Sequence, residues 1–163
     1  MLRGLYEAHL PVSNLDRSIA FYESLGLELA HRDGDVAFLW IEKRASWLGL
    51  WEVGEAHTTR GPASYPPNGR HLAFRIDFAD MEQAVDWLAE RGIASDGFGG
   101  LSGREPLARP HQGNASVYFY DPDGNHLELM CSLPDAAPKE PARLAYLREA
   151  WPEAFAAPPS ADR

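Results

Sequence analysis

The sequence predicts an α+β fold built from two tandem βαβββ modules. Residues 5–12 (LYEAHLPV) and residues 70–76 (RHLAFRI) both place a His-Leu pair in a run of alternating apolar residues, the pattern of a half-buried strand. An amphipathic helical pattern follows each run and ends at a glycine, Gly26 or Gly92. Further strand-like segments follow each helix, and the spacing between matched residues grows along the chain. The sequence therefore reads as an internal duplication with insertions in its connections.

In the first module, alternation predicts that Leu10 faces the core and His9 faces away from it. A helix is expected to begin at Ser13 or Asn14 and to end at residue 25, because side-chain oxygens of these types cap helix N-termini. Three strands are expected next, over residues 27–31, 36–41 and 47–53.

The second module repeats this order. A helix is expected from Asp77 or Asp80 to Arg91, and a short strand begins at Ile93. Two further strands, over residues 115–120 and 126–131, are joined by an Asp-Pro-Asp-Gly-Asn turn.

Three segments lie outside the duplication. Residues 54–69 link the modules, and residues 97–112 form a Gly-rich loop of a length often found in lids or in disordered segments. We expect residues 1–133 to form one domain with modules over 5–53 and 70–131. Residues 134–163 then form a tail that is partly helical around residues 142–150.

Composition and charge exclude several classes of function. The chain carries 15 Lys and Arg against 24 Asp and Glu, a net charge of −9, which argues against nucleic-acid and anionic-membrane partners. No apolar run approaches the roughly 20 residues that span a bilayer, and the N-terminus lacks the features of a signal peptide. With Cys131 as its one cysteine, the chain forms no internal disulfide, and a cytoplasmic protein is expected.

Three residues form a candidate metal site. His9 and His71 occupy matched positions of the duplication, both on the strand face away from the core. Two imidazoles that bind a divalent ion favour a carboxylate partner, and Glu128 lies between two leucines with its side chain on the same kind of face. The position that matches Glu128 in the first module is Gly49, which offers no fourth ligand. Three protein ligands would leave coordination positions open for water or substrate.

Other residues are candidates for contact with a substrate. Tyr118 is expected opposite Glu128 across the second hairpin, where it would donate a hydrogen bond to that ligand or contact the substrate. His126 shares the face of Glu128 and could contact a substrate, but its place beside the turn predicts that it is exposed. Aromatic side chains flanking Gly49 and cations on or near the site face complete the set. These substrate-binding candidates are Trp47, Trp51, Arg75, Arg104, Arg109 and His111.

The chain resembles the vicinal oxygen chelate superfamily over residues 5–133. The resemblance is carried by HLPVSNLDRSIAFYESLGLEL, RHLAFRIDFADMEQAVDWLAERGI and VYFYDPDGNHLEL. It implies a cupped mixed sheet around one divalent metal, with ligands at His9, His71 and Glu128. The chemistry implied is chelation of neighbouring substrate oxygens, with stabilisation of developing negative charge. Members of this superfamily often form homodimers.

Individual residues distinguish between subfamilies. Glyoxalase I has a glutamate at the position of Gly49, so that activity is disfavoured. The fosfomycin-resistance enzymes look nearest, although they carry a hydroxyl residue where this chain has Pro11, and HQGNAS does not reproduce their anion-binding loop. A ring-cleaving dioxygenase would need an acid–base histidine, His57 or His111, together with Tyr118.

Two hypotheses follow. The first is an enzyme, a lyase, transferase or dioxygenase that uses Mn, Fe, Ni, Co or Zn on a small oxygenated substrate. The second is a metal-free, dimeric binding protein of the bleomycin-resistance type, which the three candidate ligands disfavour.

Overall fold

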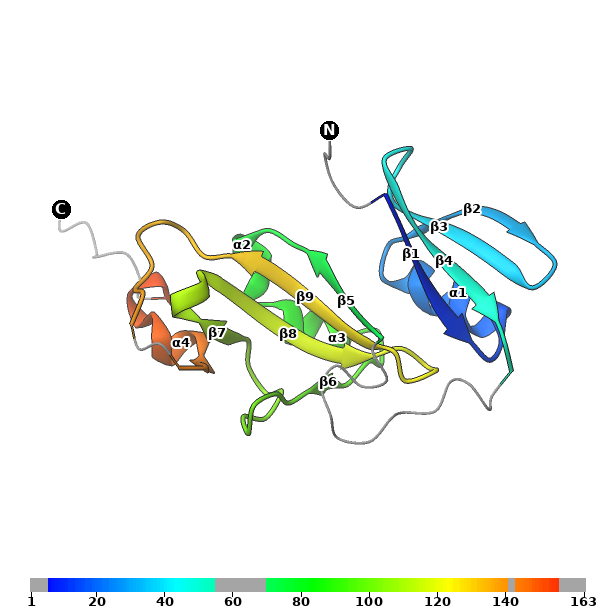
Figure 1. The fold of residues 1–163 in the computed structure, drawn as a ribbon. Coiled ribbons are helices and arrows are strands. Elements are labelled where there is room, and N and C mark those ends of the chain that lie inside the picture. Colours follow the sequence, from blue (N-terminus) through cyan, green and yellow to red (C-terminus); the bar gives the residue numbers. More distant parts are fainter. Residues whose placement is uncertain (1–5, 55–69, 141–142, 156–163) are drawn as a thin grey trace, which may run out of the picture. The chain divides into compact units, whose positions relative to one another are not determined.

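The structure is a computed structural model that describes residues 6–54, 70–140 and 143–155 (Figure 1). The predicted linker after Gly54 and His57 within it lie outside the described residues. The chain divides into two compact units. The first contains the described residues up to Leu72 together with Tyr120–His126, and the second contains Ala73–Phe119 and the chain from Leu127 onward.

The first unit has the predicted βαβββ order. It consists of β1 (Glu7–Val12), α1 (Leu15–Ser24), β2 (Glu28–Asp33), β3 (Val36–Glu42) and β4 (Ser46–Glu52). The sheet order is β1-β4-β3-β2, with β1 parallel to β4 and the remaining pairs antiparallel. The α1 helix begins where predicted, because Asn14 Oδ1 accepts a hydrogen bond from the backbone N–H of Arg17.

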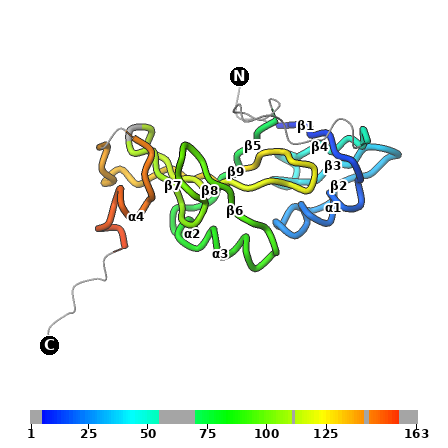
Figure 2. The backbone as a smooth tube through the Cα atoms, turned by 90° about the horizontal axis from the view of Figure 1, so that it is seen from below, coloured from blue at the N-terminus to red at the C-terminus, as the bar shows by residue number. Residues whose placement is uncertain are grey.

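The two faces of this first sheet differ as alternation requires. The α1 helix lies against one face of the sheet (Figure 2). That face and the apolar stripe of α1 form a core that is almost fully buried; its members include Leu10, Val12, Leu15, Tyr22, Leu39, Leu48 and Leu50. The other face carries His9 together with aromatic side chains from β3 and β4. The predicted orientation of His9, away from the helix, is therefore correct.

The second module supplies a sheet with the order β10-β7-β8-β9-β5, to which β6 adds by pairing with β8. Its elements are β5 (His71–Arg75), α2 (Phe78–Met81), α3 (Ala84–Ala89), β6 (Ser95–Asp96), β7 (Leu107–Arg109), η3 (Pro110–Gln112), β8 (Asn114–Tyr120), β9 (His126–Ser132), β10 (Ala145–Tyr146), α4 (Leu147–Ala150) and η4 (Pro152–Phe155). The first strand of each module lies beside the last, as in β1-β4 and β5-β9. The predicted fold class is confirmed.

Three details differ from expectation. The single helix predicted up to Arg91 is broken, because the backbone N–H of Gln83 bonds to Asp80 in a tighter turn between α2 and α3. Ile93 does not begin a strand, since its N–H bonds back to the carbonyl of Leu88 at the helix end. The expected loop 97–112 contains β7 and η3, because Leu107 and Ala108 are buried and pair with β8.

The tail also contributes to the second sheet. Ala145 and Tyr146 pair with Ala108 and Leu107 of β7, and Leu147 is buried. Within the predicted helical stretch 142–150, residues 145–150 are thus divided between the β10 strand and the short α4 helix, and residue 142 lies outside the described residues.

Candidate functional site

His9 lies on β1 directly over Gly49 of β4. The two residues are in register, and a Cβ at position 49 would lie 2.2 Å from His9 Nδ1. The imidazole therefore occupies the space in which a side chain at position 49 would begin. A glutamate at this position, the residue expected in glyoxalase I, is incompatible with this placement of the ring.

Both ring nitrogens of His9 have partners. The indole N–H of Trp51 donates to Nδ1 at 2.8 Å, and Nε2 lies 3.0 Å from a carboxylate oxygen of Glu7. Because an indole nitrogen only donates, the proton of neutral His9 is on Nε2, where it donates to Glu7. A metal at Nδ1 would replace Trp51 as the partner of that nitrogen. A metal at Nε2 would replace Glu7, and the ring proton would then be on Nδ1, facing the indole N–H of Trp51.

Aromatic rings surround His9 on the same face of the first sheet. Phe38 lies 6.0 Å from the imidazole, edge to face, and also packs against Trp47 at 4.9 Å. Trp47 in turn stacks on Trp40 at 4.8 Å, and 43% of Trp51 is exposed. The two tryptophans predicted to flank Gly49 thus form part of an aromatic wall beside His9.

His71, the second predicted ligand, contacts another histidine. Its Nδ1 lies 3.1 Å from Nδ1 of His126, and the ring centroids are 5.0 Å apart. His126 also packs against Tyr120 at 4.9 Å and is only 2% exposed. The expectation that His126 is exposed is therefore wrong, because β5 and Tyr120 cover it.

The Asp-Pro-Asp-Gly-Asn turn makes a network of hydrogen bonds within the first unit. Tyr22 of α1 donates its hydroxyl to Asp121 at 2.8 Å, and Asp123 accepts hydrogen bonds from Ser13, Arg17 and Ser18. Burial raises the pKa of Asp121, and burial beside that carboxyl raises the pKa of Tyr22 well above its usual value. These contacts hold the turn that precedes His126.

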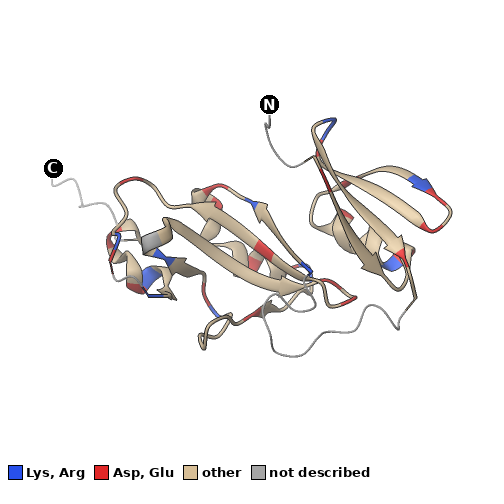
Figure 3. Cartoon of the chain, in the orientation of Figure 1, with Lys and Arg blue, Asp and Glu red and all other residues tan. Residues whose placement is uncertain are grey.

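In the second unit, Glu128 lies in a buried polar cluster with Arg109 and Tyr118. Glu128 is the one acidic residue of β9, drawn red on that strand in Figure 3. Arg109 donates to the hydroxyl of Tyr118 and to Ser116 at 3.3 Å, and its guanidinium lies 3.9 Å from Glu128. The side chains of Arg109 and Glu128 are 14% and 5% exposed. A buried cation thus lies beside the predicted carboxylate ligand.

Tyr118 connects these two charges. Burial and the neighbouring carboxylate of Glu128 raise its pKa to about 12, against the opposing effect of Arg109. Tyr118 is therefore a neutral phenol at physiological pH. Because arginine only donates, the phenol oxygen accepts from Arg109 and its proton is directed to Glu128. The prediction that Tyr118 and Glu128 lie next to each other is confirmed.

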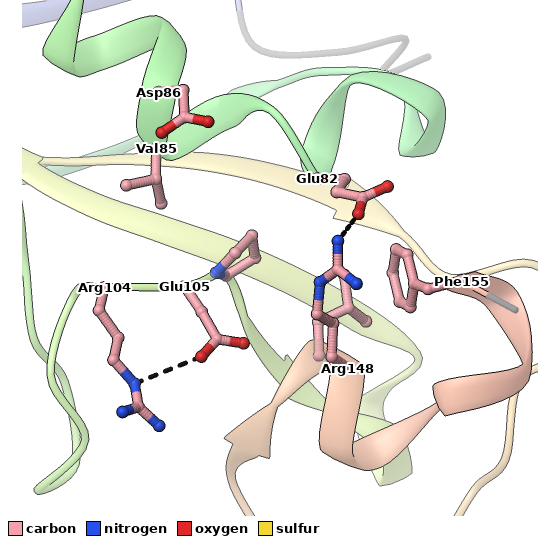
Figure 4. Close-up of a pocket in the computed structure, with 9 residues that line it drawn as sticks. Glu82, Val85, Asp86, Arg104, Glu105, Arg148 and Phe155 are labelled. Atoms are coloured by element: carbon pink, nitrogen blue, oxygen red, sulfur yellow. Dashed lines mark ion pairs between the residues drawn. The ribbon is translucent and has the colours of Figure 1, made fainter.

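The remaining predicted residues lie elsewhere. Arg75 is exposed at the end of β5, and the side chain of His111, in η3, lies outside the described residues. Arg104 lines a cleft of about 90 Å³ formed by α3, α4, η4 and the neighbouring residues 82 and 104–106 (Figure 4). It pairs there with Glu105 at 3.3 Å, and neither Arg109 nor Glu128 lines this cleft.

The donor set of the predicted site fits a divalent metal. Two imidazoles and a carboxylate are common ligands of Mn, Fe, Ni, Co and Zn, and an imidazole ligand usually uses its second nitrogen in a hydrogen bond, as His71 does. His9 and His71 belong to the first unit and Glu128 to the second. Across the described ranges, no three His, Cys, Asp or Glu side chains gather into a group that could hold a metal ion.

Comparison with known proteins identifies the family. Residues 4–129 match the Glyoxalase/Bleomycin resistance protein/Dioxygenase superfamily. The chain belongs to this superfamily. Among curated relatives, the metallothiol transferase FosB of Staphylococcus haemolyticus is 32% identical over 154 residues, which cover 93% of this chain and 96% of that protein.

Solved structures share the fold of this chain. An integron cassette protein from the mobile metagenome of a Halifax Harbour sewage outfall is 28% identical with a TM-score of 0.62, over 80% of this chain and 99% of that one. The fosfomycin resistance protein FosX of Mesorhizobium loti is 25% identical with a TM-score of 0.57, over 81% and 94%. These relatives identify a metal-dependent enzyme of the vicinal oxygen chelate type that acts on a small substrate. None of the helices that the structure describes in this chain is long and apolar enough to cross a bilayer.

One residue of these clusters, Ser116, is absent from the predicted set. Ser116 is fully buried on β8 and accepts from Arg109, and its place two positions before Tyr118 on the same strand face was the available signal. His126 is predicted on the face of Glu128, and only its predicted exposure is wrong, because the structure buries it beside His71.

Proposed function

We propose that this protein transfers a thiol to a small epoxide that carries an anionic group, with fosfomycin as the first substrate to test. Two relatives support this choice, one named a metallothiol transferase and the other a fosfomycin resistance protein. In this reaction a thiolate sulfur attacks a ring carbon, the C–O bond of the epoxide breaks, and the oxygen takes a proton. The product is a thioether bearing a neighbouring hydroxyl group.

The observation that carries the proposal is the position of Arg109. Its guanidinium is largely buried, yet its closest acidic contact, Glu128, is 3.9 Å away, longer than a charge-assisted hydrogen bond. The guanidinium donates hydrogen bonds to the neutral hydroxyls of Tyr118 and Ser116. A buried guanidinium whose hydrogen bonds go to neutral groups can bind an anionic substrate group, to which it donates two parallel hydrogen bonds.

Three residues of the chain would hold the metal and one would assist proton transfer. We assign His9, His71 and Glu128 as ligands of a divalent ion, which supplies Lewis-acid stabilisation of the negative charge on the epoxide oxygen. Tyr118 stays protonated because its pKa is raised to about 12, so the proton that it directs to Glu128 in this structure would be available to a substrate oxygen once Glu128 binds the metal. Trp47 and Trp51 would form the apolar wall beside His9.

The metal, assembly and location are part of the same proposal. We propose one ion of Mn, Fe, Ni, Co or Zn per chain, a homodimer, and a cytoplasmic protein. We propose one glyoxalase-like domain over residues 1–133, with modules over 5–53 and 70–131, and a partly helical C-terminal tail over residues 134–163.

Metal analysis and a thiol-addition assay test the proposal together. Purified protein should contain one of the five metals in stoichiometric amount, and His71→Ala or Glu128→Gln should lower the bound metal at least tenfold. Metal-loaded protein should consume fosfomycin only when a low-molecular-weight thiol is present, and a chelator should stop the reaction.

Three results would contradict it. Full binding of an aromatic ligand by the metal-free protein, without turnover, would favour the bleomycin-resistance type. Oxygen uptake with catechols would favour a dioxygenase. Turnover of a hemithioacetal would favour glyoxalase I chemistry in spite of Gly49.

A further inference from the structure

The described residues contain a histidine pair in which only one member is a proposed metal ligand. Nδ1 of His71 faces Nδ1 of His126 at 3.1 Å, with the ring planes inclined by 36°. From this contact we infer that His126 is a positioning residue, which holds the imidazole of His71 so that Nε2 is the nitrogen presented to the metal. The inference rests on the proposed function, because it takes His71 as a ligand.

The hydrogen-bonding capacity of imidazole decides which nitrogen does what. One proton lies between the two Nδ1 atoms, so one ring donates and the other accepts. When His71 binds a metal through Nε2, its remaining ring proton is on Nδ1, and the acceptor is Nδ1 of a neutral His126. His126 then carries its own proton on Nε2. Such a partner fixes both the tautomer and the plane of a ligating imidazole.

The surroundings of His126 hold it in place. Its ring is 2% exposed and packs on Tyr120, and its backbone N–H donates to the carbonyl of Arg70 at 3.3 Å. That hydrogen bond joins the start of β9 to the residue before His71. The turn that precedes His126 is itself held by Tyr22, whose hydroxyl donates to Asp121. The acceptor therefore sits on an anchored backbone, as a positioning residue must.

Two substitutions separate the hydrogen bond from the packing. His126→Phe keeps a ring against Tyr120 but removes the acceptor, whereas His126→Asn places a side-chain oxygen close to the position of Nδ1. Titration of metal-free protein with Co²⁺, followed by visible absorption and repeated with Mn²⁺ as competitor, measures affinity without any turnover. We expect His126→Phe to weaken binding by about 10- to 100-fold and His126→Asn to stay within about threefold of the original protein.

Several outcomes would overturn the inference. His126→Phe with unchanged affinity would show that the contact does not support the ligand, and equal loss in both variants would show that packing, not the acceptor, matters. Circular dichroism of the metal-free variants checks the fold. If His126→Phe does not fold, ¹⁵N NMR of the original Zn²⁺-loaded protein decides, because His71 bound through Nδ1 would contradict the inference.

The control variant is His71→Ala. If it loses the metal while His126→Phe does not, only the positioning role of His126 is wrong. If His71→Ala binds Co²⁺ as tightly as the original protein, or if the original protein binds none, the proposed ligand set is wrong and the role of His126 is excluded with it.

Discussion

Nδ1 of His9 lies 2.2 Å from the point where a Cβ at position 49 would be. The imidazole of His9 thus occupies the space that a side chain at position 49 would need, on the face of the first sheet away from α1. The atoms that a Cβ at position 49 would meet belong to the side chain of His9 and not to backbone. A larger residue at this position would therefore displace the imidazole without disrupting the strands. The identity of residue 49 therefore controls the position of a proposed ligand.

Gly49→Ala should lower metal affinity by about tenfold, the effect typical of disturbing a ligand's orientation, because His9 must rotate away. The backbone at position 49 pairs regularly with β1 and β3, so the thermal midpoint should change little. Calorimetric titration with Mn²⁺ measures the affinity. An unchanged affinity would show that the ring can move without cost to the site.

Metal binding should change the fluorescence of Trp51. Its indole N–H donates to Nδ1 of His9, and a metal at either ring nitrogen of His9 disturbs that hydrogen bond. The emission change on adding Zn²⁺ should disappear in Trp51→Phe and persist in Trp40→Phe, which is the matched control. A persistent change in Trp51→Phe would assign the signal to another tryptophan.

Arg109→Gln should raise the KM for an anionic substrate by about 10- to 100-fold, the value of one charge-assisted hydrogen-bond partner. Arg109→Lys should restore part of the loss, since lysine keeps the charge but not the fork. Arg148, which pairs with Glu82 at the cleft in Figure 4, supplies the control Arg148→Gln. An equal effect of both glutamine variants would contradict a specific role for Arg109.

Tyr22→Phe should destabilise the fold by about 1–3 kcal/mol, because buried Asp121 loses a hydrogen-bond donor. Asp121 retains the side-chain amide of Asn125 at 2.6 Å, so the protein should still fold. Urea unfolding measures the difference. The control is Tyr6→Phe, which should stay within about 0.5 kcal/mol, since Tyr6 is 52% exposed.

Cys131 should be inert in the folded protein. Burial raises the pKa of its thiol to about 11, and the thiolate is the reactive form. Relative to a thiol with the usual value of 9.0, the thiolate at pH 8 is about 100-fold rarer, and burial adds a barrier to access. Alkylation should accelerate as pH rises towards 11, and unfolding in guanidinium should abolish the protection.

Much of the scaffold follows from local patterns in the sequence. Alternation in residues 5–12 fixed the face of His9, because strand geometry leaves no other choice, and Asn14 caps α1 as its side-chain chemistry predicts. The duplication gave the order of strands and the match between Gly49 and Glu128. The breaks at Gln83 and Ile93 escaped prediction because they depend on which backbone partner each N–H finds.

The sequence by itself determined the superfamily, the two βαβββ modules and the residue types of the proposed site. Only the tertiary structure decided what each of those residues contacts: His126 against His71, Trp51 against His9, and Arg109 between Tyr118 and Ser116. The physical reason is that strand periodicity fixes the face of a side chain, whereas its partner comes from a neighbouring strand that folding brings beside it.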